Sequence, residues 1–151
     1  MWQSALKRPL SSVIPRRIRS RRKELAALLN KIVLYAQDVE KTVDFYKRHF
    51  GFYELKEDDD KAVSLIGLDG GASLMVRQAG KGQQAGQSTV RLVFDVEDVG
   101  AFCAKCASEG LRFGALQQAD GYVFANAKDP CKNSLSVSGR AFRACQNLRP
   151  A

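Results

Sequence analysis

An internal repeat is the feature of this sequence that most constrains how it can fold. Two stretches share one order of apolar and turn residues, and the matching sites are Val33-x4-Asp38 with Val93-x4-Asp98, Gly51 with Gly110, and Ser73-Leu74 with Ser134-Leu135. A sheet must cover its apolar face with another element, and each half is too short to do so alone. We therefore expect the two halves to combine into one domain.

Each half has the residue pattern of one strand, one helix and then three strands. β-Branched and aromatic runs predict the strands, apolar residues at helical spacing predict the helices, and turns containing Gly or Asp separate the strands. In the first half we expect a strand at 29–36, a helix at 39–50, and strands at 52–57, 61–68 and 72–78. In the second half we expect a strand at 88–95, a helix at 96–110, and strands at 111–116, 121–127 and 133–139. This order predicts an α+β fold.

The net charge of +8 is distributed unevenly along the 151 residues. Residues 1–29 hold eight Lys or Arg and one Glu, whereas the rest of the chain holds sixteen basic and fifteen acidic residues. We therefore divide the chain into a basic arm at 1–29, a domain at 30–139 and a tail at 140–151. The nearly neutral domain offers no basic face, so binding of nucleic acid is expected only through the arm.

The arm is open to three interpretations. Its Arg- and Ser-rich composition, with Pro9 and Pro15, is compatible with a dispensable extension, an organelle transit peptide or a nucleic-acid-binding tail, and residues 19–29 could form a short helix. No apolar run approaches the roughly 18–20 residues of a membrane helix, so we expect no membrane span. Four cysteines without a secretory signal indicate reduced thiols. A cytoplasmic location is therefore expected, with an organelle as the alternative.

The motifs together resemble one known group of proteins. With LYAQDVEKTVDFYKRHFGF opening the first half, VRLVFDVEDVGAF opening the second and DPCKN near the end, the chain resembles the vicinal oxygen chelate superfamily. That superfamily includes glyoxalase I, extradiol dioxygenases, fosfomycin-resistance enzymes and bleomycin-binding resistance proteins. Over residues 30–139 the resemblance implies paired βαβββ modules that form one curved eight-stranded mixed sheet with helices outside. It also implies a concave ligand cavity and a homodimer.

The resemblance identifies four positions at which metal-dependent members bind a divalent ion. Here these positions hold Lys31, Met75, Arg91 and Ser136. Protonated Lys and Arg have no lone pair to offer a hard cation, and their charge repels it. The usual metal site is therefore predicted to be absent, and no cofactor is expected. The single histidine, His49, is expected to be a partly exposed helix residue stabilised by the helix dipole rather than a catalytic group.

If both first strands face the cavity as in the family, period-two alternation selects a set of lining residues. The candidate ligand-binding residues are Lys31, Val33, Tyr35, Met75, Arg91, Val93, Asp95 and Ser136. Lys31 and Arg91 could hold an anionic group such as a carboxylate or phosphate. The alternative is that both are surface residues paired with local acids, either Asp95 or the acidic segment at 57–60.

The favoured function is a metal-free protein that binds a small anionic or amphipathic ligand in the concave cleft without changing it. One alternative is a glyoxalase- or dioxygenase-type enzyme, a lyase or oxidoreductase, with non-standard metal ligands or with Lys31 and Tyr35 as general acid and base. A second alternative is a degenerate scaffold that holds no small ligand. No catalytic residue is assigned in the favoured interpretation.

Overall fold

The computed structural model describes residues 27, 29–55 and 62–143. Several segments named above lie outside the described residues. They are the arm up to residue 26, the expected helix at 19–29 apart from its last residues, the acidic segment at 57–60 and the tail from residue 144.

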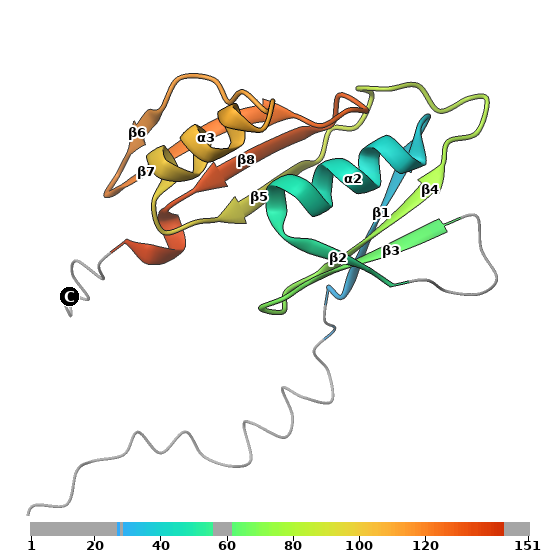
Figure 1. Cartoon of the computed structure of the whole chain (residues 1–151), viewed down its shortest axis with the longest axis horizontal. Helices are drawn as coiled ribbons and strands as arrows, with labels where there is room; N and C mark the ends of the chain where they lie inside the picture. The colour runs from blue at the N-terminus through green and yellow to red at the C-terminus, as the bar shows by residue number, and fades with distance from the viewer. Residues whose placement is uncertain (1–26, 28, 56–61, 144–151) are drawn as a thin grey trace, which may run out of the picture.

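The first module follows the expected order of elements and forms a four-stranded mixed sheet (Figure 1). Its elements are β1 (Lys31–Ala36), α2 (Val39–Phe50), β2 (Phe52–Leu55), β3 (Ala62–Gly67) and β4 (Ser73–Gln78). The strands lie in the order β1-β4-β3-β2, with β1 and β4 parallel and the other neighbours antiparallel.

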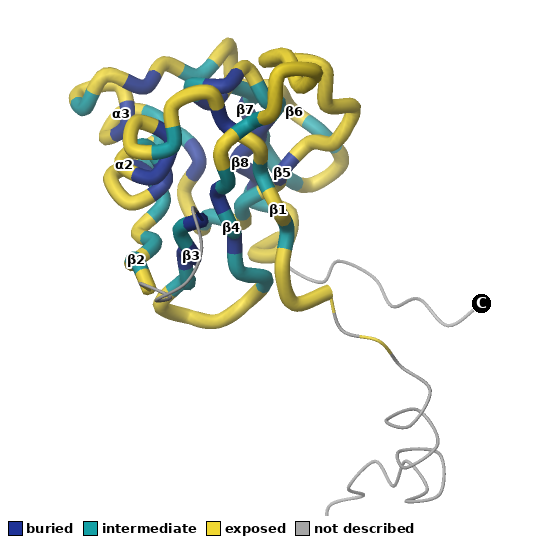
Figure 2. Tube along the Cα trace, turned by 90° about the vertical axis from the view of Figure 1, so that its right-hand side faces the viewer, coloured by how far each residue is buried: buried dark blue, intermediate teal, exposed yellow. Residues whose placement is uncertain are grey.

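The second module repeats this topology. Its elements are β5 (Arg91–Asp95), α3 (Val99–Ser108), β6 (Gln117–Ala119), β7 (Tyr122–Lys128) and β8 (Ser134–Ser138), followed by the 3₁₀ helix η1 (Arg140–Phe142). The strand order is β5-β8-β7-β6, again with the outer first strand parallel to the last. The α+β class and the paired βαβββ modules are thus confirmed. The eight strands are divided between two four-stranded sheets, with helices α2 and α3 grouped on one side of the molecule (Figure 2).

The ends of the helices are determined by local side-chain chemistry. Asp38 and Asp98 each precede a helix with extended backbone, and their carboxylates accept hydrogen bonds from the backbone N–H three residues later, at 3.0 and 2.9 Å. Each aspartate satisfies an N–H that would otherwise lack a partner in the first turn. Gly51 ends α2 at a φ of 68°, a conformation that glycine adopts without strain.

The hydrophobic core joins the two modules. One cluster combines Tyr46 and Leu65 of the first module with Leu92 and Leu135 of the second. The ring of Phe50, at the end of α2, stacks on Phe94 of β5 with centroids 4.1 Å apart. Neither module therefore buries its apolar surface alone, as the repeat predicted.

A buried polar network joins the modules as well. The Tyr46 hydroxyl donates to Asp129 Oδ2 at 2.9 Å, and both residues are buried, at 0% and 4% exposure. The other donors to the Asp129 carboxylate are the backbone N–H groups of Cys131 and Asn133 and the Asn133 side-chain amide, at 2.8–2.9 Å. Burial, and then the neighbouring Asp129 carboxylate, raise the pKa of Tyr46 far above its ordinary value of 10.0. The turn at 129–133 is thus attached to helix α2.

The structure corrects several expectations. The helix expected at 96–110 is α3 at Val99–Ser108, because Asp98 has extended backbone and caps the helix, and the strand expected at 88–95 begins only at Arg91. Residues 111–116 form no strand, and β6 begins only at Gln117. Leu111 instead follows the end of α3, with its N–H donating to Cys106 O at 2.8 Å, which draws its side chain into the core. His49 is not partly exposed but buried, at 7% exposure. The Phe45 ring, 5.1 Å away, and Glu109 of the second module cover it.

No helix in the described part of the chain is long and apolar enough to cross a lipid bilayer.

Candidate functional site

The first strand of each module presents its predicted site residues on its exposed face. In β1, Lys31, Val33 and Tyr35 are exposed, while the alternate residues turn toward the core. In β5, Arg91, Val93 and Asp95 are exposed, and Leu92 between them is buried. This alternation follows from the two-residue period of a strand.

Strand register places the last two predicted residues beside these faces. Met75 of β4 is the partner of Val33, and Ser136 of β8 is the partner of Val93. Residues paired in register project on the same side of a sheet. Met75 is half-buried, whereas Ser136 is buried and donates a hydrogen bond to Asn126 Oδ1 at 2.6 Å. The eight predicted residues therefore lie on two equivalent strand faces.

A pocket of about 240 Å³ brings together part of the predicted site. Val33 and Tyr35 line it, together with Asn133 just before β8 and residues 82–84, 87 and 88 of the connector between the modules. The other six predicted residues lie outside this pocket. The Gln37 side chain donates to Gln83 O at 3.0 Å, and Gly86 N–H donates to Cys131 O at 2.9 Å, which holds the connector in place.

The connector was not among the predicted site residues. Its Gly- and Gln-rich sequence is typical of an exposed linker, and residues 80–90 are indeed exposed. The contribution to a pocket arises from tertiary hydrogen bonds to Gln37 and Cys131, which no local pattern reveals. The one sequence feature that pointed to a pocket wall here was the set of glutamine side chains at 83, 84 and 87.

The donor chemistry at Lys31, Met75, Arg91 and Ser136, the four positions at which the resemblance places metal ligands, does not fit a divalent ion. Two of these residues are cations, one is a thioether and one is the hydroxyl that already donates to Asn126. Hard divalent ions require carboxylate, carbonyl or water oxygens, and transition metals in proteins favour imidazole or thiolate. Among residues 27, 29–55 and 62–143, no three His, Cys, Asp or Glu side chains come together.

The groups with perturbed pKa values lie away from these strand faces. Burial lowers the pKa of His49, partly opposed by Glu109, whose Oε2 lies 3.6 Å from His49 Nδ1. Neither of these two buried atoms has a hydrogen-bond partner among the described residues. Burial raises the pKa of the Cys103 and Cys106 thiols on α3, which disfavours the reactive thiolate.

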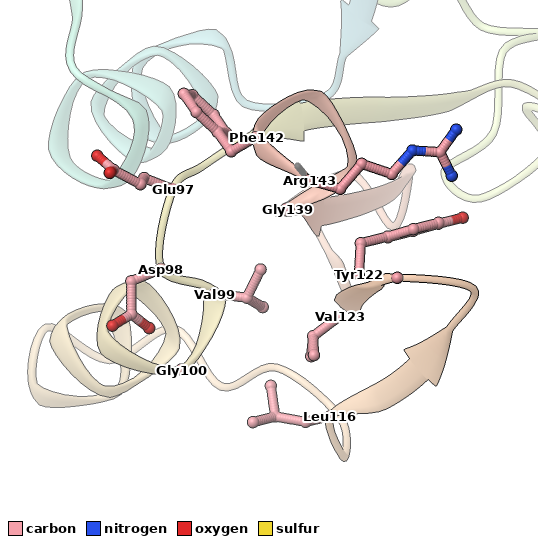
Figure 3. Close-up of a pocket in the computed structure, with 11 residues that line it drawn as sticks. Glu97, Asp98, Val99, Gly100, Leu116, Tyr122, Val123, Gly139, Phe142 and Arg143 are labelled. Carbon is pink, nitrogen blue, oxygen red and sulfur yellow. The ribbon is translucent and has the colours of Figure 1, made fainter. Parts of the chain in front are cut away.

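Two larger hollows lie elsewhere on the molecule. One, of about 710 Å³, lies between the start of α3, the β6–β7 turn and η1. Figure 3 shows Val99, Val123 and Leu116 on the floor of this hollow and the Arg143 side chain beside Tyr122. The other, of about 610 Å³, follows α2 toward Glu109 and Asp129. Neither includes a predicted site residue.

Comparisons with solved structures show the same fold. The structure of TnmS3, an antibiotic binding protein from Streptomyces sp. CB03234, is 20% identical, with a TM-score of 0.64 over 75% of this chain and 95% of that one. Lactoylglutathione lyase from Agrobacterium tumefaciens is 16% identical, with a TM-score of 0.59 over 76% and 94%. TioX from Micromonospora sp. ML1 is 20% identical, with a TM-score of 0.60 over 74% and 98%.

No curated protein matches the chain. The family model described as Glyoxalase/Bleomycin resistance protein/Dioxygenase superfamily matches residues 28–137, which include both modules. The chain therefore belongs to the glyoxalase/bleomycin resistance protein/dioxygenase superfamily.

Proposed function

We propose that this protein binds a small anionic or amphipathic molecule on the exposed faces of β1 and β5 without a metal ion. The observation that carries the proposal is the placement of Lys31 and Arg91, two exposed cations, at positions where metal-dependent members of the family hold ligands. Next to them lie the apolar residues Val33 and Val93 and the phenol of Tyr35. Binding pockets commonly combine apolar walls with a few polar groups that orient the ligand.

The likeness to an antibiotic binding protein supports this class of function. The same fold also occurs in a lactoylglutathione lyase, so the fold alone does not decide between binding and catalysis. What favours binding in this chain is the donor set. Neither an imidazole nor a carboxylate stands at the four family metal positions, so a metal-activated reaction has no ligands there.

We propose in addition that two copies of the chain cover these faces. Val33, Tyr35 and Val93 are 41%, 48% and 58% exposed, and the first-module face continues into Tyr53 and Leu55, both 44% exposed. The register places Leu55, Ser64, Met75 and Val33 in one row across the sheet. An exposed apolar face of this kind is typical of an interface or a ligand site. Sedimentation of the full chain should show a dimer.

A thermal-shift screen of anionic and amphipathic small molecules tests the binding function. A ligand at 100 times its dissociation constant stabilises the folded state by about 2.7 kcal/mol. Val93→Asp should abolish the stabilisation because it places a charge on the apolar part of the face. Leu68→Asp is the matched control, because Leu68 is 78% exposed in the turn between β3 and β4 and lies off both faces.

Metal analysis of the protein purified from its native cell completes the test. Less than about 0.1 equivalent of zinc, iron, nickel or manganese is expected. A stoichiometric ion that is lost in a Lys31→Ala, Arg91→Ala double variant would refute the metal-independent site. A screen in which no compound stabilises the protein would instead support a scaffold without ligand.

A further inference from the structure

One row of side chains on the second sheet gathers hydrogen-bond donors and positive charge. Arg91 of β5 pairs in register with Ser134 of β8, and Ser134 pairs with Lys128 of β7. The three side chains therefore project from the same face of three adjacent strands, which are spaced about 4.8 Å apart. Arg91 and Lys128 are exposed, and Ser134 is half-buried.

The hydrogen bond between Lys128 and Ser134 leaves several donor hydrogens of this row unused. Lys128 Nζ lies 2.8 Å from Ser134 Oγ. Because an ammonium group can only donate, the serine oxygen accepts, and its own hydrogen is available for another acceptor. The row thus offers the Arg91 guanidinium, the Ser134 hydroxyl hydrogen and the remaining ammonium hydrogens of Lys128, while its one side-chain acceptor, Ser134 Oγ, already accepts from Lys128.

The two cations of the row have no carboxylate partner among the described residues. Asp95, the acid on the same face of β5, is four residues from Arg91, or about 13 Å along the strand. Lys128 also borders the groove along α2, whose lining includes five acids: Asp38, Glu40, Asp44, Glu109 and Asp129. No ion pair within 4.0 Å joins Arg91 or Lys128 to an acid in the described part of the chain. Arg91 and Lys128 lie on strands separated by β8, and an anion bound between them is attracted by both charges.

The other rows of the two faces lack this combination. In the next row the Ser136 hydroxyl is already used, since it donates to Asn126. The following row contains the acid Asp95. In the first module the equivalent of Ser134 is Ser73, and its hydroxyl donates to Asn30 O at 2.9 Å. Among the described rows of the two faces, the row of Arg91, Ser134 and Lys128 is thus the one with an open hydroxyl between two cations.

We propose that Arg91, Ser134 and Lys128 form a subsite for a doubly charged tetrahedral oxyanion, a phosphate or sulfate group carried by the ligand. This inference rests on the proposed binding function and specifies the ligand class. Two positive charges match a dianion, and three donors from three strands match the several oxygens of a tetrahedral group. A carboxylate neutralises only one of the two charges.

The surroundings of this row suggest where the organic part of the ligand lies. Val93 is the next residue on the same face of β5. Asn133, which precedes Ser134, lines the pocket of about 240 Å³ that also contains Tyr35. An organic phosphate can therefore place its anionic group on the row and its apolar part against Val93 or in this pocket.

Isothermal titration of the full chain with inorganic phosphate, and separately with phenyl phosphate, tests the proposal. The titrations are done at pH 8, where phosphate is mainly dianionic, at constant ionic strength. Phosphate should bind, and phenyl phosphate should bind more tightly because of its apolar ring. Arg91→Gln, Lys128→Gln and Ser134→Ala should each weaken both by about tenfold or more, since charge-assisted hydrogen bonds are lost.

Two control variants remove the same charges elsewhere. Arg112→Gln and Lys105→Gln change exposed cations outside the row and should bind phosphate as the wild type does. An equal loss in these controls would show a non-specific charge effect and overturn the proposal. Acetate binding as tightly as phosphate would also overturn it, because the site would then select carboxylates. Urea unfolding of every variant shows whether a loss of binding is a loss of folding.

Failure of this subsite is distinguishable from failure of the binding function. The subsite is wrong if phosphate does not bind, or if no variant of the row changes the affinity for phosphate. The binding function still stands in that case if an uncharged compound stabilises the wild type but not Val93→Asp. In the converse outcome, phosphate binds through the row, while no organic compound stabilises the protein and phenyl phosphate stabilises it no more than phosphate does. The subsite then stands and the wider binding function is wrong.

Discussion

Replacing Tyr46 with phenylalanine should measurably weaken the connection between the two modules. The change removes one hydrogen bond, from the hydroxyl to Asp129 Oδ2 at 2.9 Å, between two buried residues. The ring is kept, so its packing in the core is preserved. Asp129 Oδ2 still accepts from the Asn133 amide and is not left without a donor. We therefore expect the free energy of unfolding to fall by about 1.5–3 kcal/mol, the range for a hydrogen bond to a charged group.

Asp129→Asn should lower the free energy of unfolding more than Tyr46→Phe does. The carboxylate of Asp129 accepts from four donors, whereas an asparagine side chain accepts at one atom and presents its own N–H groups at the other. One pair of donors would then face another pair in a buried site. The expected loss is about 3–5 kcal/mol. In a double-mutant cycle, the two variants should show a coupling of at least about 1 kcal/mol.

Urea unfolding followed by circular dichroism measures these losses. Tyr53→Phe is the control, because Tyr53 is exposed on β2, and its stability should stay within about 0.5 kcal/mol of the wild type. If Tyr46→Phe is as stable as Tyr53→Phe, or if the cycle with Asp129→Asn is additive, the network does not stabilise the junction as argued.

The dependence of stability on alkaline pH gives a second test of the buried Tyr46 hydroxyl. The pKa of Tyr46 in the folded protein lies above the ordinary 10.0, so above pH 10 the unfolded state loses a proton that the folded state keeps. Stability should therefore fall with rising pH by up to about 1.4 kcal/mol per pH unit from this group, and Tyr46→Phe should remove that contribution.

Three further predictions follow from local structure. Because burial lowers the pKa of His49, acidification below its ordinary 6.5 should destabilise the fold, and His49→Gln should flatten this part of a stability profile measured between pH 5 and 8. Asp38→Ala and Asp98→Ala should each cost about 1 kcal/mol in urea unfolding, and equal stability to the wild type would contradict the capping role. Leu135→Ala, in the core of the second module, should cost about 2–5 kcal/mol, and a loss below 1 kcal/mol would show that this core is poorly packed.

The repeat, the ends of α2 and the strand faces could be predicted because each depends on local chemistry, whereas α3 begins three residues later than expected. Asp38 and Asp98 bond to N–H groups three residues away, and Gly51 takes a backbone conformation that other residues avoid. The faces of β1 and β5 follow from alternation alone. Whether these faces bind the expected ligand stays a prediction.

The features that were missed depend on contacts between distant segments. His49 is buried because Glu109, sixty positions later in the sequence, lies against it. Leu111 is drawn into the core by the end of α3, which delays the start of β6. The pocket beside Tyr35 exists because the connector bonds to Gln37 and Cys131. Periodicity in the sequence describes none of these contacts.

The pocket beside Tyr35 takes part of its wall from a segment that lies outside the hydrophobic core. Residues 82–84, 87 and 88 of the connector line the pocket beside Tyr35, yet all of them are exposed and none belongs to the apolar core. Changes in the length of an exposed loop cost little free energy. We therefore expect insertions and substitutions between the modules to reshape this pocket over successive generations, while both sheets and their shared interior stay unaltered.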